Sequence, residues 1–379
     1  MLKKVAKHML RNYLKIKGIA YKSYIPLNDC NIDVIKRESK VKINIISFTE
    51  ENNKETKNPL FPSPNSNRSI RPLIAKAKIY FIDARDTNFS FRDNHLIDEE
   101  LNVIYEDGLK YNYLPIYAKS VEKPVHLNGT VAYLSNTGTS NYYHWVCLTL
   151  PLLKYYKEFV GLENIDYYYI GKGLTKFQIE TLKILGISEE QLVQQACYAD
   201  RLVFSLCNRK KFNGYAPITY NAYKFVRGNL MKNYVPKDSL SKKRIYVRRG
   251  NVKHRKVLNE EKVISLLKKY SFEILDMDNR SVQEQIQIFN EAEVIIAPHG
   301  AALTNLLFVN PGTKVVELLP DQYSHNCFYA LASYGQCDYY YLNNTNGENQ
   351  REAAYGKANK LDINVDINKL EDICKLIFN

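Results

Sequence analysis

Short apolar runs alternate with amphipathic segments along the second half of the chain, and this alternation is the clearest pattern in the sequence. Five runs rich in β-branched and aromatic residues are expected to be strands: RIYVRR, FEILDM, EVIIAP, KVVELL and CDYYYL. The segments between them have helical spacing: NEEKVISLLKKY, SVQEQIQIFNEA, AALTNLLFV and a helix through HNCFYALASYG. This alternation predicts a parallel sheet covered by helices on both faces, with NKLEDICKLIF as a closing helix.

A weaker strand–helix rhythm precedes it from about residue 130. Expected strands are TVAYL, IDYYYIG and RLVFSLC, and expected helices are NYYHWVCLTLPLLKYYKEF, TKFQIETLKIL and TYNAYKFVRGNLMKNYV. Before residue 120 only KINIISF and KIYFIDA are expected to be strands, and the polar segment 50–71 is expected to be a surface loop.

The length of the chain indicates two domains, because 379 residues exceed what one hydrophobic core usually organises. We expect an N-terminal domain over residues 1–235 and a C-terminal domain over 236–350, followed by a closing segment over 351–379. The polar stretch PKDSLSKK has the composition of a linker between the two domains.

Residues 1–25 are expected to form a basic amphipathic helix. Apolar residues recur at helical spacing: Leu2, Val5, Met9, Leu10, Tyr13 and Leu14. Lysines and arginines lie between them, and no acidic residue precedes Asp29. Such a helix can lie on an anionic membrane surface. It can equally pack on its own domain with a solvated basic face. No continuous apolar run is long enough for a signal peptide or a transmembrane helix.

Charge and cysteine content narrow the class of partner and the compartment. The net charge of +13 favours an anionic partner: nucleotide phosphates, an acidic polysaccharide, a membrane surface or nucleic acid. The seven cysteines form no CxxC pair, which argues against a structural zinc site and a disulfide framework. We therefore expect a cytoplasmic protein, either free or peripheral on the inner face of the membrane.

The segment EVIIAPHGAALTN carries the most specific chemistry. An apolar strand ends in Pro298-His299-Gly300, and a helix is expected to open at Ala301. The first turn of a helix exposes unpaired N–H groups, and Gly300 lets an anion approach the backbone closely. With His299, Thr304 and Asn305 added, the pattern favours a phosphate site over a tight turn that binds nothing.

Three charged residues are further candidates for binding the same ligand. Arg248 and Arg249 end the first strand of this half, and alternation sends them to opposite faces, so one of the two is expected to reach a diphosphate. Glu317, late in the strand KVVELLP, could accept hydrogen bonds from ribose hydroxyls. The alternatives are a solvated basic edge for the arginines and a pairing with a lysine for Glu317.

The run from RIYVRRG to KVVELLP resembles the glycosyltransferase 61 family, and NYYHWVCLTLPLL resembles the family's N-x-x-H-W…L-P segment. The resemblance implies an α/β fold of the GT-B type, with two Rossmann-like domains facing across a cleft. It also implies a nucleotide-sugar donor, usually linked to UDP, and inversion at the anomeric carbon without a metal or other cofactor. The acceptor would be a glycan or lipid-linked glycan, as in capsule or surface polysaccharide synthesis.

Carried over residue by residue, the resemblance assigns donor-binding roles along the C-terminal half. The matching positions are Arg249 (with Arg248 as the alternative), Arg255, Asn259, His299, Gly300, Ala301, Asn305 and Glu317. Gln285 also matches the family's pattern, without an assigned role. The chain departs from the family at Leu148, where an acidic residue is frequent, and in a longer spacing between Arg249 and Arg255. Asp276-Met277-Asp278 is formally an Asp-x-Asp triplet, but it falls in a strand-to-helix turn of the resembling run, so no metal is expected.

An inverting transfer needs a base for the acceptor hydroxyl, and His144 is the first candidate. It follows Asn141, a plausible N-cap, so it should lie in the first turn of a helix, where the neutral imidazole is favoured. The alternatives are a buried histidine in an aromatic cluster with Tyr143 and Trp145, and His299 as the base.

Other function classes fit the sequence less well. A nucleic-acid-binding protein would need base-stacking aromatics or a basic recognition helix, and neither motif is present. An inactive sugar-nucleotide-binding module is suggested by Leu148. Another GT-B transferase that uses a GDP- or CMP-sugar is the remaining enzymatic alternative.

Overall fold

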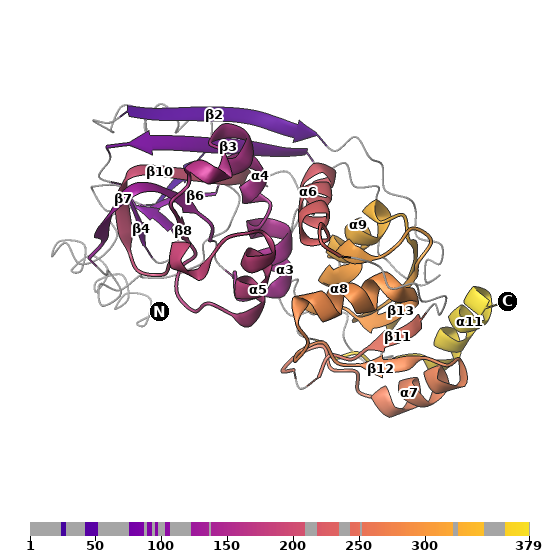
Figure 1. Ribbon diagram of the computed structural model, residues 1–379. Helices are drawn as coiled ribbons and strands as arrows, with labels where there is room; N and C mark the ends of the chain where they lie inside the picture. Colours follow the sequence, from indigo (N-terminus) through magenta and orange to yellow (C-terminus); the bar gives the residue numbers. More distant parts are fainter. Residues whose placement is uncertain are drawn as a thin grey trace, which may run out of the picture. The chain divides into compact units, whose positions relative to one another are not determined.

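The structure is a computed structural model and describes residues 24–27, 42–51, 76–86, 89–92, 95–97, 103–106, 123–135, 138–208, 218–234, 243–250, 252–320, 325–344 and 361–378. The chain divides into two compact units, with a boundary between Thr219 and Tyr220 (Figure 1). The segment TYNAYKFVRGNLMKNYV, expected in the N-terminal domain, therefore contributes its helix to the second unit. Nearly all of the predicted helix over 1–25, the loop over 50–71 and the linker PKDSLSKK lie outside the described residues.

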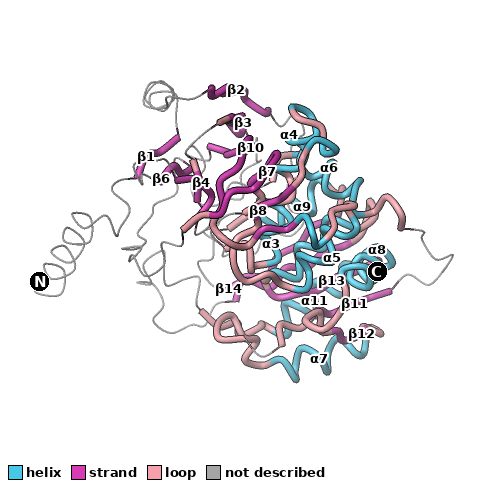
Figure 2. The backbone as a smooth tube through the Cα atoms, turned by 60° about the vertical axis from the view of Figure 1, so that its left-hand side comes forward, coloured by secondary structure: helices cyan, strands magenta, loops and turns pink. Residues whose placement is uncertain are grey.

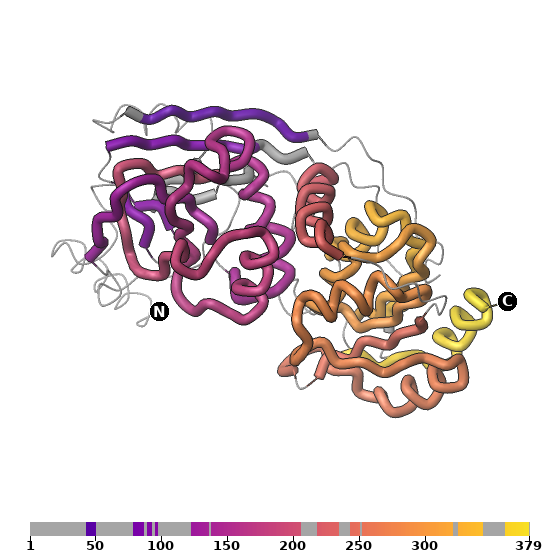
Figure 3. Tube along the Cα trace, viewed as in Figure 1, coloured from indigo at the N-terminus to yellow at the C-terminus, as the bar shows by residue number. Residues whose placement is uncertain are grey.

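The second unit contains the parallel sheet that the sequence predicts. Its strands are β11 (Lys243–Val247), β12 (Glu273–Leu275), β13 (Ala292–Pro298), β14 (Lys314–Pro320) and β15 (Asp338–Asn344). Its helices are α6 (Tyr220–Leu230), α7 (Glu260–Lys269), α8 (Val282–Glu291), the 3₁₀ helix η5 (Ala301–Phe308), α9 (Cys327–Tyr334) and α11 (Ile367–Phe378). The strand order is β12-β11-β13-β14-β15, and every pair of neighbours is parallel. Figure 3 traces the alternation of strand and helix along the orange part of the chain.

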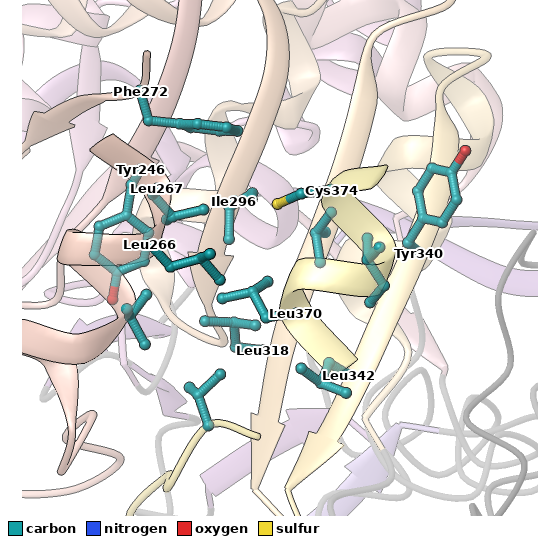
Figure 4. Packing of buried hydrophobic residues seen from close by; sticks show 14 of the residues in the cluster. Tyr246, Leu266, Leu267, Phe272, Ile296, Leu318, Tyr340, Leu342, Leu370 and Cys374 are labelled. Atoms are coloured by element: carbon teal, nitrogen blue, oxygen red, sulfur yellow. The ribbon is translucent and has the colours of Figure 1, made fainter. Parts of the chain in front are cut away.

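Strand alternation divides the side chains of this sheet between two helical layers. Tyr246, Ile296 and Leu318 lie in one apolar core with Leu266 of α7 and Leu370 of α11 (Figure 4). The opposite face carries α8, η5 and α9: η5 contacts both helices, α8 contacts β13, and α9 contacts β15. Figure 2 separates these helices, in cyan, from the strands in magenta. Because helices cover both faces of the sheet, the ends of its parallel strands are the parts left uncovered.

Local sequence signals fix where the helices begin. At the start of α8 the Ser281 side chain accepts from the Glu284 N–H, and the Glu284 carboxylate accepts from the Ser281 N–H. The Ser-x-x-Glu pattern therefore forms a capping box, which satisfies two of the first-turn donors. Thr175 and Gln178 form the same arrangement at the start of α5 (Lys176–Ile184) in the first unit.

The first unit is built on a mixed sheet. Its strands are β1 (Tyr24–Leu27), β2 (Lys42–Glu51), β3 (Lys76–Arg85), β4 (Ser90–Arg92), β5 (His95–Ile97), β6 (Val103–Glu106), β7 (Val125–Tyr133), β8 (Tyr167–Tyr169), β9 (Leu192–Val193) and β10 (Cys197–Asn208). Its helices, besides α5, are α3 (Tyr142–His144), the π-helix η2 (Trp145–Thr149), α4 (Leu152–Phe159) and the 3₁₀ helices η3 (Leu162–Asn164) and η4 (Glu189–Gln191). The strands expected from KINIISF and KIYFIDA are confirmed as β2 and β3.

The Rossmann-like expectation for this half is met only by β7, β8, β9 and β10, whose successive pairings are parallel. In contrast, β3 pairs antiparallel with both β10 and β2, and β4 pairs antiparallel with β10. Parallel neighbours need a crossover connection, usually a helix, and the described residues before 123 are almost entirely strand. Antiparallel neighbours need no such helix. The lack of helices among the described residues before 123 therefore explains why β3 and β4 pair antiparallel.

A buried carboxylate links three segments of the first unit. Glu50 of β2 is 6% exposed and accepts hydrogen bonds from Lys154 Nζ (2.9 Å), the Tyr155 hydroxyl (3.0 Å) and Thr219 Oγ1 (2.6 Å). Each carboxylate oxygen is engaged, so the buried charge is compensated.

Among the described residues, no helix combines the length and apolar character that crossing a membrane requires.

Candidate active site

The strand order of the second unit places two of the predicted loops beside each other. The chain leaves β11 toward β12 at one edge of the sheet and leaves β13 toward β14 on the other side. The paired strands β11 and β13 therefore flank the point where the strand order reverses. Ligands of open α/β sheets bind outside the carboxyl ends of the strands at such a point. The residues located there are Arg248 and Arg249 after β11, and His299 and Gly300 after β13.

The two arginines diverge, as strand alternation predicts. Arg248 donates from Nε and Nη2 to Glu260 Oε2 at 3.1 and 2.9 Å, and this hydrogen bond raises the pKa of the guanidinium. Arg249 instead donates from Nη1 to the backbone carbonyl of His299. Arg249 is therefore the arginine that joins the two loops, while Arg248 forms an ion pair with α7.

Gly300 leaves room for the Arg249 guanidinium to lie against the loop. A Cβ atom at residue 300 would lie 2.0 Å from Arg249 Nη1, well inside any allowed contact. The φ angle of Gly300 is −175°, an extended backbone that any residue adopts. The glycine thus serves close packing of a cation on the loop and not an unusual backbone conformation.

His299 lies under this loop in a buried polar chain. Its Nδ1 is hydrogen-bonded to Glu317 Oε1, and Glu317 Oε2 accepts from the Tyr339 hydroxyl. The Phe328 ring packs on the imidazole with centroids 4.7 Å apart. Glu317 is 1% exposed, and its two oxygens are engaged by His299 and Tyr339. Its predicted contact with ribose stays a prediction.

The helix expected after Gly300 is a 3₁₀ helix, η5, whose first bond runs from the Leu303 N–H to the Gly300 carbonyl at 3.0 Å. Thr304 and Asn305 are each 0% exposed, so their side chains point into the unit. Asn305 Nδ2 donates to Gln285 Oε1 at 2.7 Å and joins η5 to α8. Their predicted contacts with the donor stay predictions. Ala301 is half-buried in the first turn, where its backbone belongs to the loop.

Asn259 is also a supporting residue. Its Nδ2 donates to the Val365 carbonyl at 2.8 Å, and its Oδ1 accepts from the Val365 N–H at 2.9 Å. Both atoms of the side-chain amide are thus hydrogen-bonded to the backbone that precedes α11. The predicted contact of Asn259 with the donor stays a prediction. Arg255 is half-buried and adopts a left-handed backbone with φ 60°. Its role in donor binding stays a prediction.

His144 lies in the first unit, in the helical turn that the sequence predicts. Asn141 caps this turn, since its Oδ1 accepts from the N–H groups of Tyr143 (3.0 Å) and His144 (3.3 Å). A Cβ atom at Gly138 would lie 2.9 Å from His144 Nδ1, so the preceding turn passes close to the ring. His144 is half-buried, while Trp145 is fully buried and donates from Nε1 to Thr181 at 2.8 Å. Trp145 is therefore held in the interior of the unit, whereas His144 stays partly exposed.

The chain continues from His144 into the π-helix η2, where the Leu150 N–H donates to the Trp145 carbonyl at 2.9 Å. Single-turn π-helices of this kind are frequent at functional sites. Leu148, the position of the family's acidic residue, is 8% exposed within this turn.

Metal ligation has no candidate in the described parts of the chain, where no group of three or more His, Cys, Asp or Glu side chains could hold an ion. A Cβ atom at Gly250 would lie 2.9 Å from Asp278 Oδ2 and 4.0 Å from Asp276 Oδ1. These carboxylates therefore flank the turn after β11. The metal-free site stays a prediction.

Two residues of the site were not foreseen. Tyr339 binds Glu317, and Arg227 of α6 donates from Nη1 to the Leu307 carbonyl at the end of η5. Tyr339 lies in a run of three tyrosines, and only strand register distinguishes the one that faces Glu317. Arg227 lies outside the resembling run, and nothing in its local pattern points to η5.

Residues 142–316 match the family described as Glycosyltransferase 61. This segment begins at α3 and ends inside β14, so it contains His144, Arg249 and the His299 loop.

Three glycosyltransferases are similar to parts of the chain. A β-1,2-xylosyltransferase of Oryza sativa subsp. japonica is 33% identical over 63 residues, which are 17% of this chain and 12% of the rice protein. A protein O-linked-mannose β-1,4-N-acetylglucosaminyltransferase 2 of Takifugu rubripes is 32% identical over 105 residues, 25% of this chain and 18% of the fish protein. An EGF domain-specific O-linked N-acetylglucosamine transferase of Mus musculus is 31% identical over 102 residues, 26% of this chain and 19% of the mouse protein. The similarity thus covers under a fifth of each relative.

Proposed function

We propose, from the match of residues 142–316 to the glycosyltransferase 61 family, that the chain transfers a sugar from a nucleotide donor to a glycan or lipid-linked glycan. The donor we propose is a UDP-sugar. The observation that carries the proposal is the Arg249–His299 hydrogen bond at the reversal of strand order in the second unit. A guanidinium fixed over a glycine at that place suits the diphosphate of a nucleotide sugar.

We infer a GT-B arrangement in which the second unit binds the donor and the first unit binds the acceptor. Parallel pairing in both units, over β7–β10 and over β11–β15, supports this inference. Transfer proceeds with inversion and without a metal. His144 takes the proton of the acceptor hydroxyl, and Arg249 stabilises the leaving diphosphate.

We further propose a role in capsule or surface polysaccharide synthesis at the inner face of a membrane. The net charge of +13 and the basic pattern of residues 1–25 support attraction to anionic lipids and glycans. Liposome co-sedimentation of the full chain should require anionic lipid and weaken with salt. Deletion of residues 1–25 should abolish it, and unchanged binding after the deletion would refute this assignment.

The proposed activity is tested with a thermal-shift panel of UDP, GDP and CMP, each with and without EDTA, followed by assays of UDP-sugar hydrolysis and transfer. UDP should raise the melting temperature, since a ligand that binds only the folded state stabilises it, and EDTA should leave the shift unchanged. Stabilisation by GDP or CMP instead would select the other donor class. Binding of UDP without hydrolysis or transfer of any sugar tested would select an inactive binding module.

A further inference from the structure

A buried chain of three polar side chains lies beneath the proposed diphosphate site. Glu317 is 1% exposed, Tyr339 3% and His299 5%. They come from neighbouring strands: Glu317 lies in β14, Tyr339 in β15, and His299 directly after β13. The register pairs Ala297 with Glu317, so His299, two residues further along, lies on the same face of the sheet as the carboxylate.

The hydrogen bonds of Glu317 determine which nitrogen of His299 carries a proton. The Tyr339 hydroxyl donates to Oε2, which favours the ionised carboxylate. An ionised carboxylate only accepts, so the Nδ1 of His299 must donate to Oε1. A carboxylate at this depth is unfavourable without hydrogen-bond donors, so the two contacts of Glu317 define its surroundings. With Nδ1 bonded to Glu317, a contact of the ring with a ligand would be made through Nε2.

Other groups around the imidazole limit its orientation and its charge. The Phe328 ring of α9 packs on it, at an interplanar angle of 51°. The Arg249 guanidinium bonds the carbonyl of the same residue and brings a second positive charge to the loop. Arg249 opposes an imidazolium, but the Glu317 carboxylate is bonded directly to the ring and outweighs it.

We propose that Glu317 and Tyr339 are positioning residues that hold His299 as an imidazolium whose Nε2–H donates to the diphosphate of the sugar donor. This inference rests on the proposed function and adds a second cation to Arg249. During transfer the bond between the anomeric carbon and the diphosphate oxygen breaks, and its electron pair leaves with the diphosphate. The acceptor oxygen bonds to the anomeric carbon and its proton goes to the base. His299 keeps its proton and stabilises the leaving charge through the hydrogen bond.

The test compares Glu317→Gln and Tyr339→Phe with two matched controls. Glu293→Gln removes a carboxylate that pairs with Arg244 at 2.8 Å, and Tyr340→Phe removes the hydroxyl of the next residue, whose ring lies in the core on the other face. Because Gln cannot compensate the imidazolium, Glu317→Gln should lower kcat roughly 10²- to 10³-fold, the effect of losing one transition-state donor. Tyr339→Phe should lower kcat about fivefold to tenfold, as expected for one hydrogen bond. The controls should retain wild-type kcat.

Two readouts separate positioning from general destabilisation. Loss of the carboxylate weakens the imidazolium, so the basic limb of the kcat profile should move to lower pH in Glu317→Gln. UDP affinity of the wild type should fall as the pH is raised, while uridine affinity, measured in parallel, stays constant. Glu317→Gln should lose this difference. If Glu317→Gln lowers the melting temperature, the same two readouts are measured in Tyr339→Phe, which removes a single hydroxyl.

The outcomes distinguish the inference from the function on which it rests. Wild-type protein that binds no UDP and transfers no sugar would overturn both. Wild-type protein that binds UDP and transfers sugar, with both variants equal to their controls in kcat and pH profile, would overturn the inference alone.

Discussion

Arg249 donates a hydrogen bond to the backbone carbonyl of His299 and so fastens the loop after β11 to the loop after β13. The bond has an electrostatic consequence for the proposed site. A carbonyl oxygen carries negative partial charge and would repel a phosphate, but the guanidinium covers this one and presents positive charge instead. The first two predictions follow from this relationship.

Gly300→Ala should displace the guanidinium without disturbing the fold. The added Cβ would lie 2.0 Å from Arg249 Nη1, whereas the extended φ of −175° accepts alanine without strain. Losing one charge-assisted hydrogen bond, worth about 1.5–3 kcal/mol, should weaken UDP binding roughly 10- to 100-fold by titration calorimetry. Gly228→Ala is the matched control, because nothing lies within 4 Å of its added Cβ. Wild-type UDP affinity in Gly300→Ala would show that the guanidinium is not part of the site.

The two arginines should respond differently to truncation. Arg249→Ala should lower kcat roughly 10²- to 10³-fold if it stabilises the leaving diphosphate, and Arg249→Lys should restore little, since lysine lacks the planar fork. Arg248→Ala should mainly lower stability, because Arg248 is paired with Glu260 at 2.9 Å. Kinetics and urea unfolding on the same preparations provide the comparison. The opposite ranking in kcat would assign the diphosphate to Arg248.

Asn259→Ala should reduce stability and spare donor binding. The substitution leaves the N–H and the carbonyl of Val365 without the amide that now satisfies both. Each group left unsatisfied costs about 1–3 kcal/mol, so the urea midpoint should fall clearly. UDP affinity of the folded protein should match the wild type. A variant of normal stability with weakened UDP binding would restore the role that the family resemblance assigned to Asn259.

The second unit could be predicted almost completely, since its central strands β13 and β14 are buried on both faces and are therefore continuous apolar runs. The burial of its polar residues was harder to predict. Glu317 was placed near a strand end, but β14 continues to Pro320, so Glu317 is its central residue and points toward helices. Thr304 and Asn305 follow a glycine in a helix that is apolar all round, and such a helix buries its few polar members too.

The mixed sheet of the first unit could not be derived from local patterns. β3 and β10 are separated by more than a hundred residues and pair antiparallel. Which distant strand pairs with β10 depends on the whole sheet and not on the local pattern of either strand. His144 was placed correctly because its signal is local: Asn141 is a good N-cap and does cap the turn. Local capping chemistry is predictable from sequence, and long-range strand pairing is not.

His144→Ala tests the last assignment, the catalytic base. The Asn141 cap fixes the backbone of the turn that carries His144. Removing a general base should lower transfer roughly 10²- to 10⁴-fold and abolish the acidic limb of the kcat/KM profile. UDP affinity should be unchanged, because His144 belongs to the first unit and the donor loops to the second. His126→Ala, which removes another histidine of the first unit, one that pairs with Asp200 at 3.0 Å, is the control and should stay active.

Comparison with His299→Ala completes this test, because the two histidines are assigned to opposite tasks. If His299 stabilises the diphosphate, its loss should weaken UDP binding as well as kcat and leave the acidic limb in place. If His144→Ala remains active while His299→Ala loses transfer with UDP affinity intact, His299 is the base and its Glu317 contact serves that role instead. If both variants remain active, the general base is a carboxylate elsewhere in the first unit, because Leu148 offers no ionisable group beside His144.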